Sequence, residues 1–302
     1  MELLITSAPV FIIIAIGALA KWLKIADDKW IDILNKFALY IGFPALIFTS
    51  LVSLESSAAI DYPLFLFNSL LLIAAFATIY IILNRLRVKK DIRNCYLMCA
   101  VFGNVAYFGF PYITPIIQDS GGMVSIIVAS GLVLMFTMGL WVLENSRSKK
   151  ASLAGTIKKI IKNPLLIAVI LGVVFVHLNI TPPQVLENSL SMLAKGASPV
   201  VLFALGIFLV RKIEYNKKLP HSVIITAIKL IALPAVFMAA GVYLFKETSY
   251  PIAVIEAGMP TALTWFALSQ IYPMNKTIVV YTIIISTILS VITLPIITTL
   301  LL

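Results

Sequence analysis

The stretch VIEAGMPTALTWFALSQ, residues 254–270, places a carboxylate, Glu256, and a proline, Pro260, four residues apart in an otherwise apolar segment. Inside a bilayer a charged side chain is costly, and a proline removes a backbone donor that no water can replace. Residues of this kind are tolerated where a helix is interrupted and faces a wet cavity instead of lipid. The stretch therefore indicates a membrane protein with a broken helix.

The composition extends this interpretation to the whole chain. Of the 302 residues, 61% are hydrophobic and 12% are charged, and the mean hydropathy is +1.05, far from the values of soluble domains. Apolar runs near the ~20 residues that a spanning helix needs recur along the sequence. We expect ten membrane helices, at about residues 4–22, 31–53, 62–84, 94–117, 123–144, 163–180, 188–210, 219–245, 251–271 and 275–301. Because the longest polar connection is 145–162, residues 1–302 are predicted to form a single membrane transporter domain of an all-α integral membrane protein.

The basic residues predict an orientation. Alternating the loops between the two membrane faces puts twenty of the 23 Lys and Arg residues on one face, including those of 85–93, 145–163 and 211–218. By the positive-inside rule this face is cytoplasmic, which leaves both termini outside. The net charge of +10 is therefore explained by topology and by contact with anionic membrane lipid, and we expect no nucleic-acid partner.

The side chains that catalysis requires are not grouped in this sequence. Cys95 and Cys99 stand four residues apart, a spacing that matches no metal or redox motif. His177 and His221 are predicted near opposite faces, and no nucleophile triad or phosphate loop is present. We therefore expect no enzyme and no resident cofactor.

The glycines and prolines reveal an internal repeat. At an offset of 155 residues the matches are Pro9 with Pro164, Gly17 with Gly172, Pro44 with Pro199, Phe48 with Phe203 and Gly103 with Gly258. The two repeats are predicted at about 1–150 and 156–302. Because five helices per repeat is an odd number, the second repeat must enter the membrane from the opposite side, which is the inverted plan of many secondary transporters.

Helices four and nine occupy equivalent places in this repeat, and both carry helix-breaking residues. Helix four contains CAVFGNVAYFGFPYITP, residues 99–115, and helix nine contains the opening stretch. An interrupted helix presents free N–H groups suited to an anion and free carbonyls suited to a cation. We therefore predict a ligand site between broken helices four and nine. The substrate-binding residues proposed there are Gly103, Asn104, Met259, Pro260 and Thr261.

Three charged residues are predicted well inside the bilayer. Glu256 lies about six residues below the outer surface, Lys229 lies near mid-depth, and Lys195 lies one turn before Pro199 in helix seven. Ionisable groups at such depths are usually functional. We assign Lys195 to the substrate site and Glu256, Asn104 and Lys229 to ion coupling. Structural alternatives remain: a lysine can extend its charge to the interface, and Lys229 can simply pair with Glu256.

At these residues the chain resembles the auxin efflux carrier family, which includes the plant PIN-type carriers and bacterial permeases. The resemblance covers nearly the whole chain and depends on the order and spacing of several short motifs. They are FPALIF (43–48), GNVAYFGFP (103–111), NPLLIAVILGVV (163–174), SPVVLFALGIFL (198–209), KLIALPAV (229–236) and EAGMPTALTWFALSQIY (256–272).

The resemblance implies a scaffold that includes helices one, two, six and seven, and a mobile bundle in which helices four and nine cross. It implies elevator-like alternating access, small organic anions as substrates, and Asn104 as a carboxylate contact at the crossing. The chain departs from the plant pattern at Gly103, where the plant carriers have proline, and it lacks their long central loop.

The stretch IEAGM, residues 255–259, also resembles helix nine of the bile acid sodium symporters, in which a glutamate helps to bind sodium. This likeness implies sodium at Glu256 and Asn104, although Pro260 stands where those symporters have glutamine. Sodium–proton antiporters share the architecture, but their paired aspartates have no counterpart here, because no acidic residue occurs between Asp91 and Asp119.

Together these features predict a secondary active transporter that moves a small organic anion, such as a carboxylate, across the cytoplasmic membrane. The coupling ion is left open between sodium, proton and none, and a homodimer is an open alternative to a monomer. A membrane sensor that binds its ligand without transport is the competing hypothesis. The lack of a cytoplasmic output domain counts against the sensor.

Overall fold

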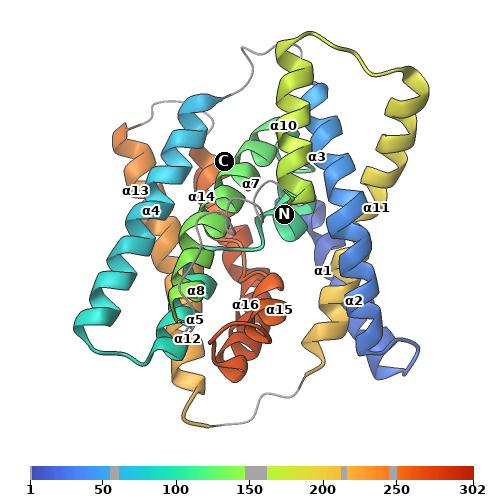
Figure 1. Ribbon diagram of the computed structural model, residues 1–302. Helices are drawn as coiled ribbons and strands as arrows, with labels where there is room; N and C mark the ends of the chain where they lie inside the picture. The colour runs from blue at the N-terminus through green and yellow to red at the C-terminus, as the bar shows by residue number, and fades with distance from the viewer. Residues whose placement is uncertain (1, 55–60, 147–161, 212–215, 245–249) are drawn as a thin grey trace. The chain divides into compact units, whose positions relative to one another are not determined.

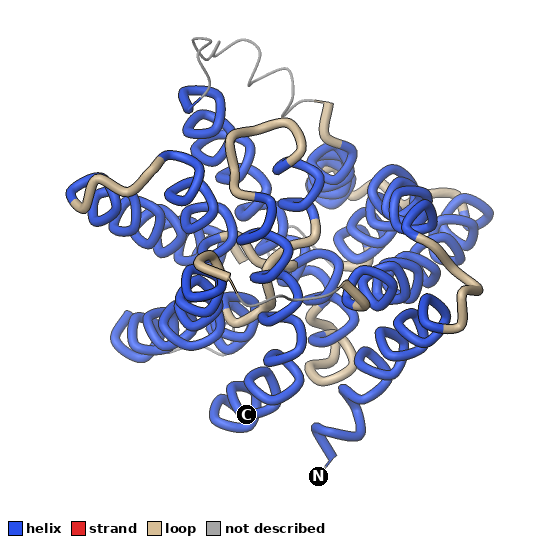
Figure 2. The backbone as a smooth tube through the Cα atoms, turned by 90° about the horizontal axis from the view of Figure 1, so that it is seen from below, coloured by secondary structure: helices blue, strands red, loops and turns tan. Residues whose placement is uncertain are grey.

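The computed structural model describes residues 2–54, 61–146, 162–211, 216–244 and 250–302. Over these ranges every regular element is helical, and Figure 2 shows helices and loops without a strand. The prediction of an all-α protein is confirmed for this part of the chain. Most of the basic loop predicted at 145–162 lies outside the described residues.

The helices are numbered in chain order, and Figure 1 labels most of the α-helices. In the first half they are α1 (Glu2–Trp22), α2 (Asp28–Phe37), η1 (Ala38–Gly42), α3 (Phe43–Val52), α4 (Tyr62–Arg85), α5 (Lys90–Val101), η3 (Val105–Gly109), α6 (Phe110–Ile113), α7 (Gly121–Leu134), η4 (Met135–Gly139) and α8 (Leu140–Ser146). In the second half they are α10 (Pro164–His177), α11 (Gln184–Leu209), α12 (Leu219–Ala227), η5 (Ile228–Ala232), α13 (Leu233–Leu244), α14 (Tyr250–Ala257), α15 (Thr264–Ser269) and α16 (Lys276–Leu301). The η elements are π-helical turns, which often occur near functional sites.

The contacts divide the chain into two compact units, and each unit draws on both halves of the sequence. Unit 1 consists of Met1–Tyr62, Ala106–Ala129 and Ile161–Lys212. Unit 2 consists of Pro63–Val105, Ser130–Ile160 and Ile213–Leu302. The units therefore do not coincide with the two sequence repeats, since each one combines helices from both.

In unit 1, α1 packs tightly along α11 because glycines let the two backbones approach. A Cβ atom added to Gly17 would lie 2.1 Å from the carbonyl oxygen of Phe203, and one added to Gly206 would lie 2.0 Å from that of Ile14. Small residues at helix contacts are typical of membrane proteins, where close packing replaces the hydrophobic driving force. These two glycines fix the contact between the first helix and α11.

In unit 2, the last helix forms the centre of the packing. The helix α16 contacts α5, α12, α14 and α15. Its buried face carries hydroxyl residues, of which Thr282 and Ser290 donate to carbonyls of their own helix at 2.7 Å. Ser286, between them, donates to the carbonyl of Ile283 at 3.3 Å and also accepts a hydrogen bond from another segment. Buried polar groups need partners, so this face is suited to contact irregular backbone.

Six helices among the described residues are long and apolar enough to cross a membrane. They are Asp28–Val52, Tyr62–Arg85, Gly121–Ser146, Gln184–Leu209, Leu219–Tyr243 and Lys276–Leu301. Two shorter apolar helices are Thr6–Trp22 and Pro164–His177. These helices overlap eight of the spans predicted from the sequence.

The other two predicted spans, 94–117 and 251–271, are interrupted in the structure. The helix α5 ends at Val101 and helical structure resumes at Val105, while α14 ends at Ala257 and α15 begins at Thr264. Gly103 lies in the first break and Gly258 in the second, separated by the offset of the sequence repeat. The helices that follow the breaks keep the same offset, because 121–146 corresponds to 276–301.

Candidate functional site

The end of α5 is held by two neutral side chains. A helix end leaves its last carbonyls without partners, and inside a membrane those carbonyls must be satisfied by protein. The hydroxyl of Thr261 donates to the carbonyl of Cys99 at 2.8 Å, and the indole Nε1 of Trp265 donates to the carbonyl of Phe102 at 3.1 Å. The second broken segment therefore caps the helix of the first.

The end of α14 is held by a charged side chain. Nζ of Lys229 donates to the carbonyl of Ala257, the last residue of α14, at 2.7 Å. Lys229 belongs to η5 and is 1% exposed. A positive charge at a helix C-terminus is favourable because the carbonyl end of the helix dipole is negative. The contact therefore gives Lys229 a defined place at the broken end of α14.

The two breaks meet and pair with each other. The backbone N–H of Asn104 donates to the carbonyl of Pro260 at 2.7 Å, and Gly103 and Thr261 form an antiparallel β-bridge. The backbone N–H of Thr261 in turn donates to Oγ of Ser286 at 3.1 Å. This pairing satisfies backbone groups that the interrupted helices leave unbonded.

The space beside Gly103 is filled, so the lack of a side chain there lets Lys229 approach closely. A Cβ atom there would lie 2.8 Å from both Cε and Nζ of Lys229 and 3.0 Å from the carbonyl oxygen of Met259. The ammonium group therefore lies directly against the crossing of the two breaks. Of the residues predicted for the substrate site, Gly103, Asn104, Met259, Pro260 and Thr261 are brought together here, and Lys229 joins them.

Two polar side chains near the crossing make no hydrogen bond to the described residues, and the atoms of one of them, Glu256, are fully buried. The side-chain amide of Asn104, in a residue that is 5% exposed, has no hydrogen bond to any of the described residues. Both carboxylate oxygens of Glu256 are also buried and unbonded within the described part of the chain. Buried polar atoms are normally satisfied, so such exceptions are candidates for binding a ligand or a proton.

Glu256 and Lys229 interact through their charges without touching. Each lies within electrostatic range of the other, but no ion pair within 4.0 Å joins them in the ranges that the structure describes. The direct pair considered from the sequence as the structural alternative is therefore absent from this conformation. Lys229 donates a hydrogen bond to a carbonyl instead, which leaves the carboxylate available to another partner.

Lys195, predicted for the same site, has a different setting. It lies in α11 of unit 1, on an exposed face of that helix, and no described contact joins it to the crossing.

Trp265 and Ser286 were not predicted, although both bind the broken segments. Trp265 offered a signal, since it stands in the middle of the opening stretch, but the hydroxyl residues of α16 recur too often to single out Ser286.

Comparisons with known proteins agree with this architecture. The family model described as membrane transport protein matches residues 3–298. An uncharacterised transporter of Methanothermobacter thermautotrophicus is 27% identical over 299 residues, which cover 96% of this chain and 95% of the relative. A protein of Rhizobium meliloti that is provisionally named a malonate transporter is 27% identical over 302 residues, covering 94% of this chain and 91% of the relative.

A plant protein is related over a shorter stretch. Auxin efflux carrier component 8 of Arabidopsis thaliana is 23% identical over 128 residues, which cover 40% of this chain and 35% of the relative. The resemblance seen in the sequence motifs is thus confirmed by a match that extends over almost every residue, and the named relatives are transporters and not enzymes. The chain belongs to the membrane transport protein family that includes the auxin efflux carriers.

Proposed function

We propose that this membrane transporter moves a small organic anion, and that the anion binds at the crossing of the two broken helices. The observation that carries the proposal is the ammonium group of Lys229, which is buried against Gly103 at the crossing. An ammonium group has three donors, and the bond to Ala257 uses one of them. The other donors, together with the amide of Asn104, suit a carboxylate.

A small dicarboxylate is the first substrate to test. Lys229 and Asn104 offer one charged and one neutral donor group near the paired breaks, which suits a ligand with more than one oxygen atom to bind. The Rhizobium meliloti relative, by its provisional name, transports malonate. Both residues are buried in this conformation, so the substrate must enter through a rearrangement. We propose alternating access of the elevator type for that step.

Glu256 is the proposed coupling residue, and either a proton or a sodium ion could neutralise it. We favour the proton, because a positive charge on Lys229 lies within electrostatic range of Glu256 and would oppose a second cation. A proton on Glu256 leaves the charge of Lys229 free to attract the anionic substrate. When Glu256 is ionised, the two residues offset each other and the anion is released. Sodium bound at Glu256 and Asn104 is the alternative, and the transport experiment with separate gradients distinguishes the two ions.

The architecture supports the elevator proposal. Among the described residues, six long spans, two shorter apolar helices and two interrupted segments support the proposal of two five-helix repeats. Unit 1 contains the helices at the start of each repeat, which are the proposed scaffold, and also residues 106–129, which follow the first break. Unit 2 contains the paired breaks and is proposed to move with the substrate. The inverted order of the repeats follows from their odd number of helices.

We further propose that the protein lies in the cytoplasmic membrane with both termini outside. The support is the concentration of Lys and Arg in alternate loops. A cysteine replacing Ser148, in the basic loop, should react with a membrane-impermeant thiol reagent only after the cells are permeabilised. Labelling in sealed, right-side-out cells would show that this loop is outside and would contradict the proposed orientation.

The test of the function is transport by the purified protein in proteoliposomes. A panel of carboxylates that includes malonate would be measured for uptake and counterflow, with imposed proton and sodium gradients in separate arms. Stimulation by the proton gradient alone supports the proton at Glu256, and stimulation by sodium supports the alternative. Substrate-induced stabilisation without either uptake or counterflow would show a sensor.

The coupling role has its own variant. Glu256→Gln keeps the shape of the side chain and imitates the neutral state, so counterflow should continue while the dependence on the driving ion is lost. Full gradient-driven accumulation by Glu256→Gln would remove Glu256 from coupling and leave the anion site unaffected.

A further inference from the structure

A groove of about 560 Å³ runs along the surface of unit 1, on the membrane-spanning helices themselves. It is lined by thirteen residues of η1, α3, α10 and α11. Twelve of them are aliphatic, aromatic or proline, and the hydroxyl of Tyr40 is the single polar side-chain group in the lining. Several lining side chains are partly exposed, with Ile41 at 45% and Leu171 at 47%. An apolar hollow that opens from a spanning helix would face lipid.

The direction of the groove follows from its ring contacts. The rings of Phe48 and Phe175 lie 5.2 Å apart and mark one end. Tyr40 and Pro164 lie earlier on the same two helices and mark the other end. From Pro164 to Phe175 the helix rises about 17 Å at 1.5 Å per residue. This length is close to half of the ~30 Å hydrocarbon core, the depth of one leaflet.

The two ends of the groove carry opposite charges. Lys36 precedes Tyr40 by four residues, or about one turn, and Lys162 precedes Pro164 by two; both are exposed. No charged residue occurs between Lys36 and Glu55 in the sequence, so Lys36 marks the polar boundary of this helix. The end near Tyr40 and Pro164 therefore carries these two lysines, and the exposed Asp32 lies one further turn away from Tyr40.

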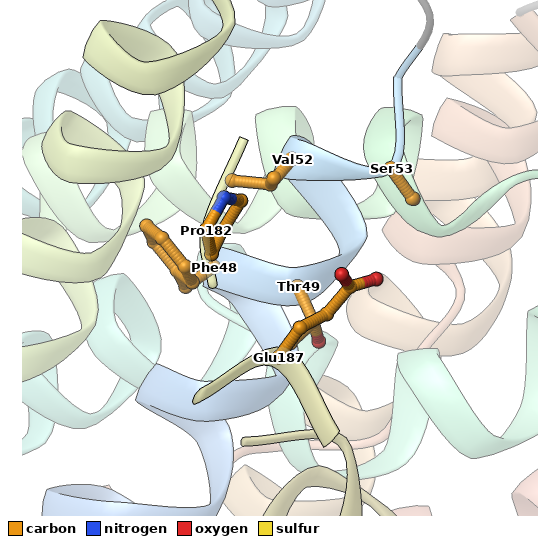
Figure 3. A pocket seen from close by; sticks show the side chains of 6 residues that line it. All are labelled: Phe48, Thr49, Val52, Ser53, Pro182 and Glu187. Carbon is orange, nitrogen blue, oxygen red and sulfur yellow. The ribbon is translucent and has the colours of Figure 1, made fainter. Parts of the chain in front are cut away.

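The opposite end is acidic. Beyond Phe48, a small hollow of about 20 Å³ is lined by residues that include Thr49, Pro182 and Glu187. Figure 3 shows Glu187 extending from α11 beside Thr49, with its carboxylate toward the α3 side of the hollow. An anion would be repelled from this end and attracted to the other.

We propose that the groove is a binding site for an anionic phospholipid. One acyl chain lies between η1, α3, α10 and α11, and the phosphate group lies at the end that carries Lys36 and Lys162. The length, the apolar lining and the charge at each end fit an amphiphile of one leaflet. The site is independent of the transport cycle; it rests on the proposed orientation only in placing this leaflet on the cytoplasmic side.

A second copy of the chain fits these features less well. In a symmetric dimer the surface that fills the groove and the groups that face the lysines would have to come from the same patch of the other subunit. The described residues around the groove are apolar, and Lys36 and Lys162 at its end are basic. A phospholipid supplies both an apolar chain and a negative charge.

The experiment is native mass spectrometry of the purified full chain, titrated with phosphatidylglycerol or with phosphatidylcholine. Phosphatidylglycerol should bind one to one and about 10-fold more tightly, because each lysine near the surface attracts an anionic headgroup. The double variant Lys36→Gln, Lys162→Gln should lower this preference to near parity. Lys217→Gln with Lys276→Gln, on exposed lysines of unit 2, is the matched control and should leave it unchanged.

A second variant tests the acyl chain. Leu171→Trp fills the groove and should weaken both lipids by about 10-fold, as expected when a large side chain occupies the space of several methylene groups. Val223→Trp, at an apolar position of α12 that is 50% exposed, is the control for a tryptophan added to the lipid-facing surface. Equal binding of the two lipids to the unmodified chain would overturn the proposal. A second outcome would also overturn the proposal: the chain forms a dimer in lipid nanodiscs, and Leu171→Trp dissociates this dimer while phosphatidylglycerol still binds.

Discussion

At the end of α5 the free carbonyls are bound by neutral groups, the hydroxyl of Thr261 and the indole of Trp265, whereas at the end of α14 the carbonyl of Ala257 is bound by the ammonium of Lys229. Both helices end at buried residues, Val101 and Ala257, and face the same need for partners. Neutral caps provide these partners without the free-energy cost of burying a charge. The charged cap exceeds what the fold requires, and its charge is therefore the better candidate for function.

The glycines in the two breaks differ in the same way. Gly103 and Gly258 are equivalent in the sequence repeat. A Cβ at Gly103 would meet the ammonium of Lys229 and a backbone carbonyl, whereas a Cβ at Gly258 would meet mainly the terminal Cδ1 of Ile297 at 2.9 Å. The first break is thus closely fitted around the charge, and the second has a neighbour that can move.

The largest effect is expected from removing the charged cap. Lys229→Met leaves the carboxylate of Glu256 buried without its positive neighbour and leaves the carbonyl of Ala257 without its donor. We expect a loss of about 3–5 kcal/mol in stability, the range found when one partner of a buried charge pair is removed. Anion counterflow should also be lost. Thermal unfolding in detergent and proteoliposome counterflow are the measurements.

The double variant separates stability from function. Adding Glu256→Gln to Lys229→Met removes the buried negative charge, so most of the lost stability should return while anion transport stays absent. Lys276→Gln, an exposed lysine of unit 2, is the control for loss of a positive charge. If the double variant transports the anion with full ion coupling, both charges are structural and the difference between the two helix ends has no functional meaning.

The next effect concerns the neutral donor beside the charged cap. Asn104→Ala should weaken carboxylate binding by about 1–3 kcal/mol, because it removes a donor to a charged ligand. The melting temperature should change little, since the Asn104 side chain has no partner among the described residues that would be left unpaired. Calorimetric titration with malonate is the measurement, and unchanged affinity would exclude Asn104 from the site.

The paired glycines give a smaller effect with an internal control. Gly103→Ala forces the ammonium of Lys229 to shift, at a cost of about 1–3 kcal/mol for overpacking, and should lower the transport rate. Gly258→Ala should cost less, because the side chain of Ile297 can adopt another rotamer. Thermal unfolding and counterflow of the two variants would be compared directly. Equal losses in both variants would contradict the difference between the breaks.

Much of this arrangement could be predicted from the sequence, because the bilayer allows few alternatives. Long apolar runs and Gly or Pro at equivalent repeat positions indicated the spans and the two breaks. The residues of the crossing could be predicted from those breaks together with the family motifs. They are Gly103, Asn104, Met259, Pro260 and Thr261. These features are properties of the backbone, and the positions of apolar, Gly and Pro residues in the sequence indicate them directly.

The partners of the side chains could not be predicted in the same way. The sequence placed Lys229 at mid-depth, yet its choice of the Ala257 carbonyl over a direct pair with Glu256 depends on the rotation of η5 about its axis. The roles of Ser286 and Trp265 depend on packing between helices that are distant in the sequence. Apolar periodicity is weak in helices that are buried on several sides, so these rotations leave little trace.

The smallest effect is expected at the neutral cap, and it tests whether that cap is only structural. Thr261→Val removes the hydroxyl that donates to the carbonyl of Cys99 and keeps the shape of the side chain, so it should cost about 1 kcal/mol of stability. Thr261→Ser keeps the donor and should cost less. Because the carbonyl of Phe102 retains the indole of Trp265, the end of α5 should remain in place and the proton dependence of counterflow should be unchanged. A loss of coupling in Thr261→Val that Thr261→Ser restores would show that the neutral end also serves the transport cycle.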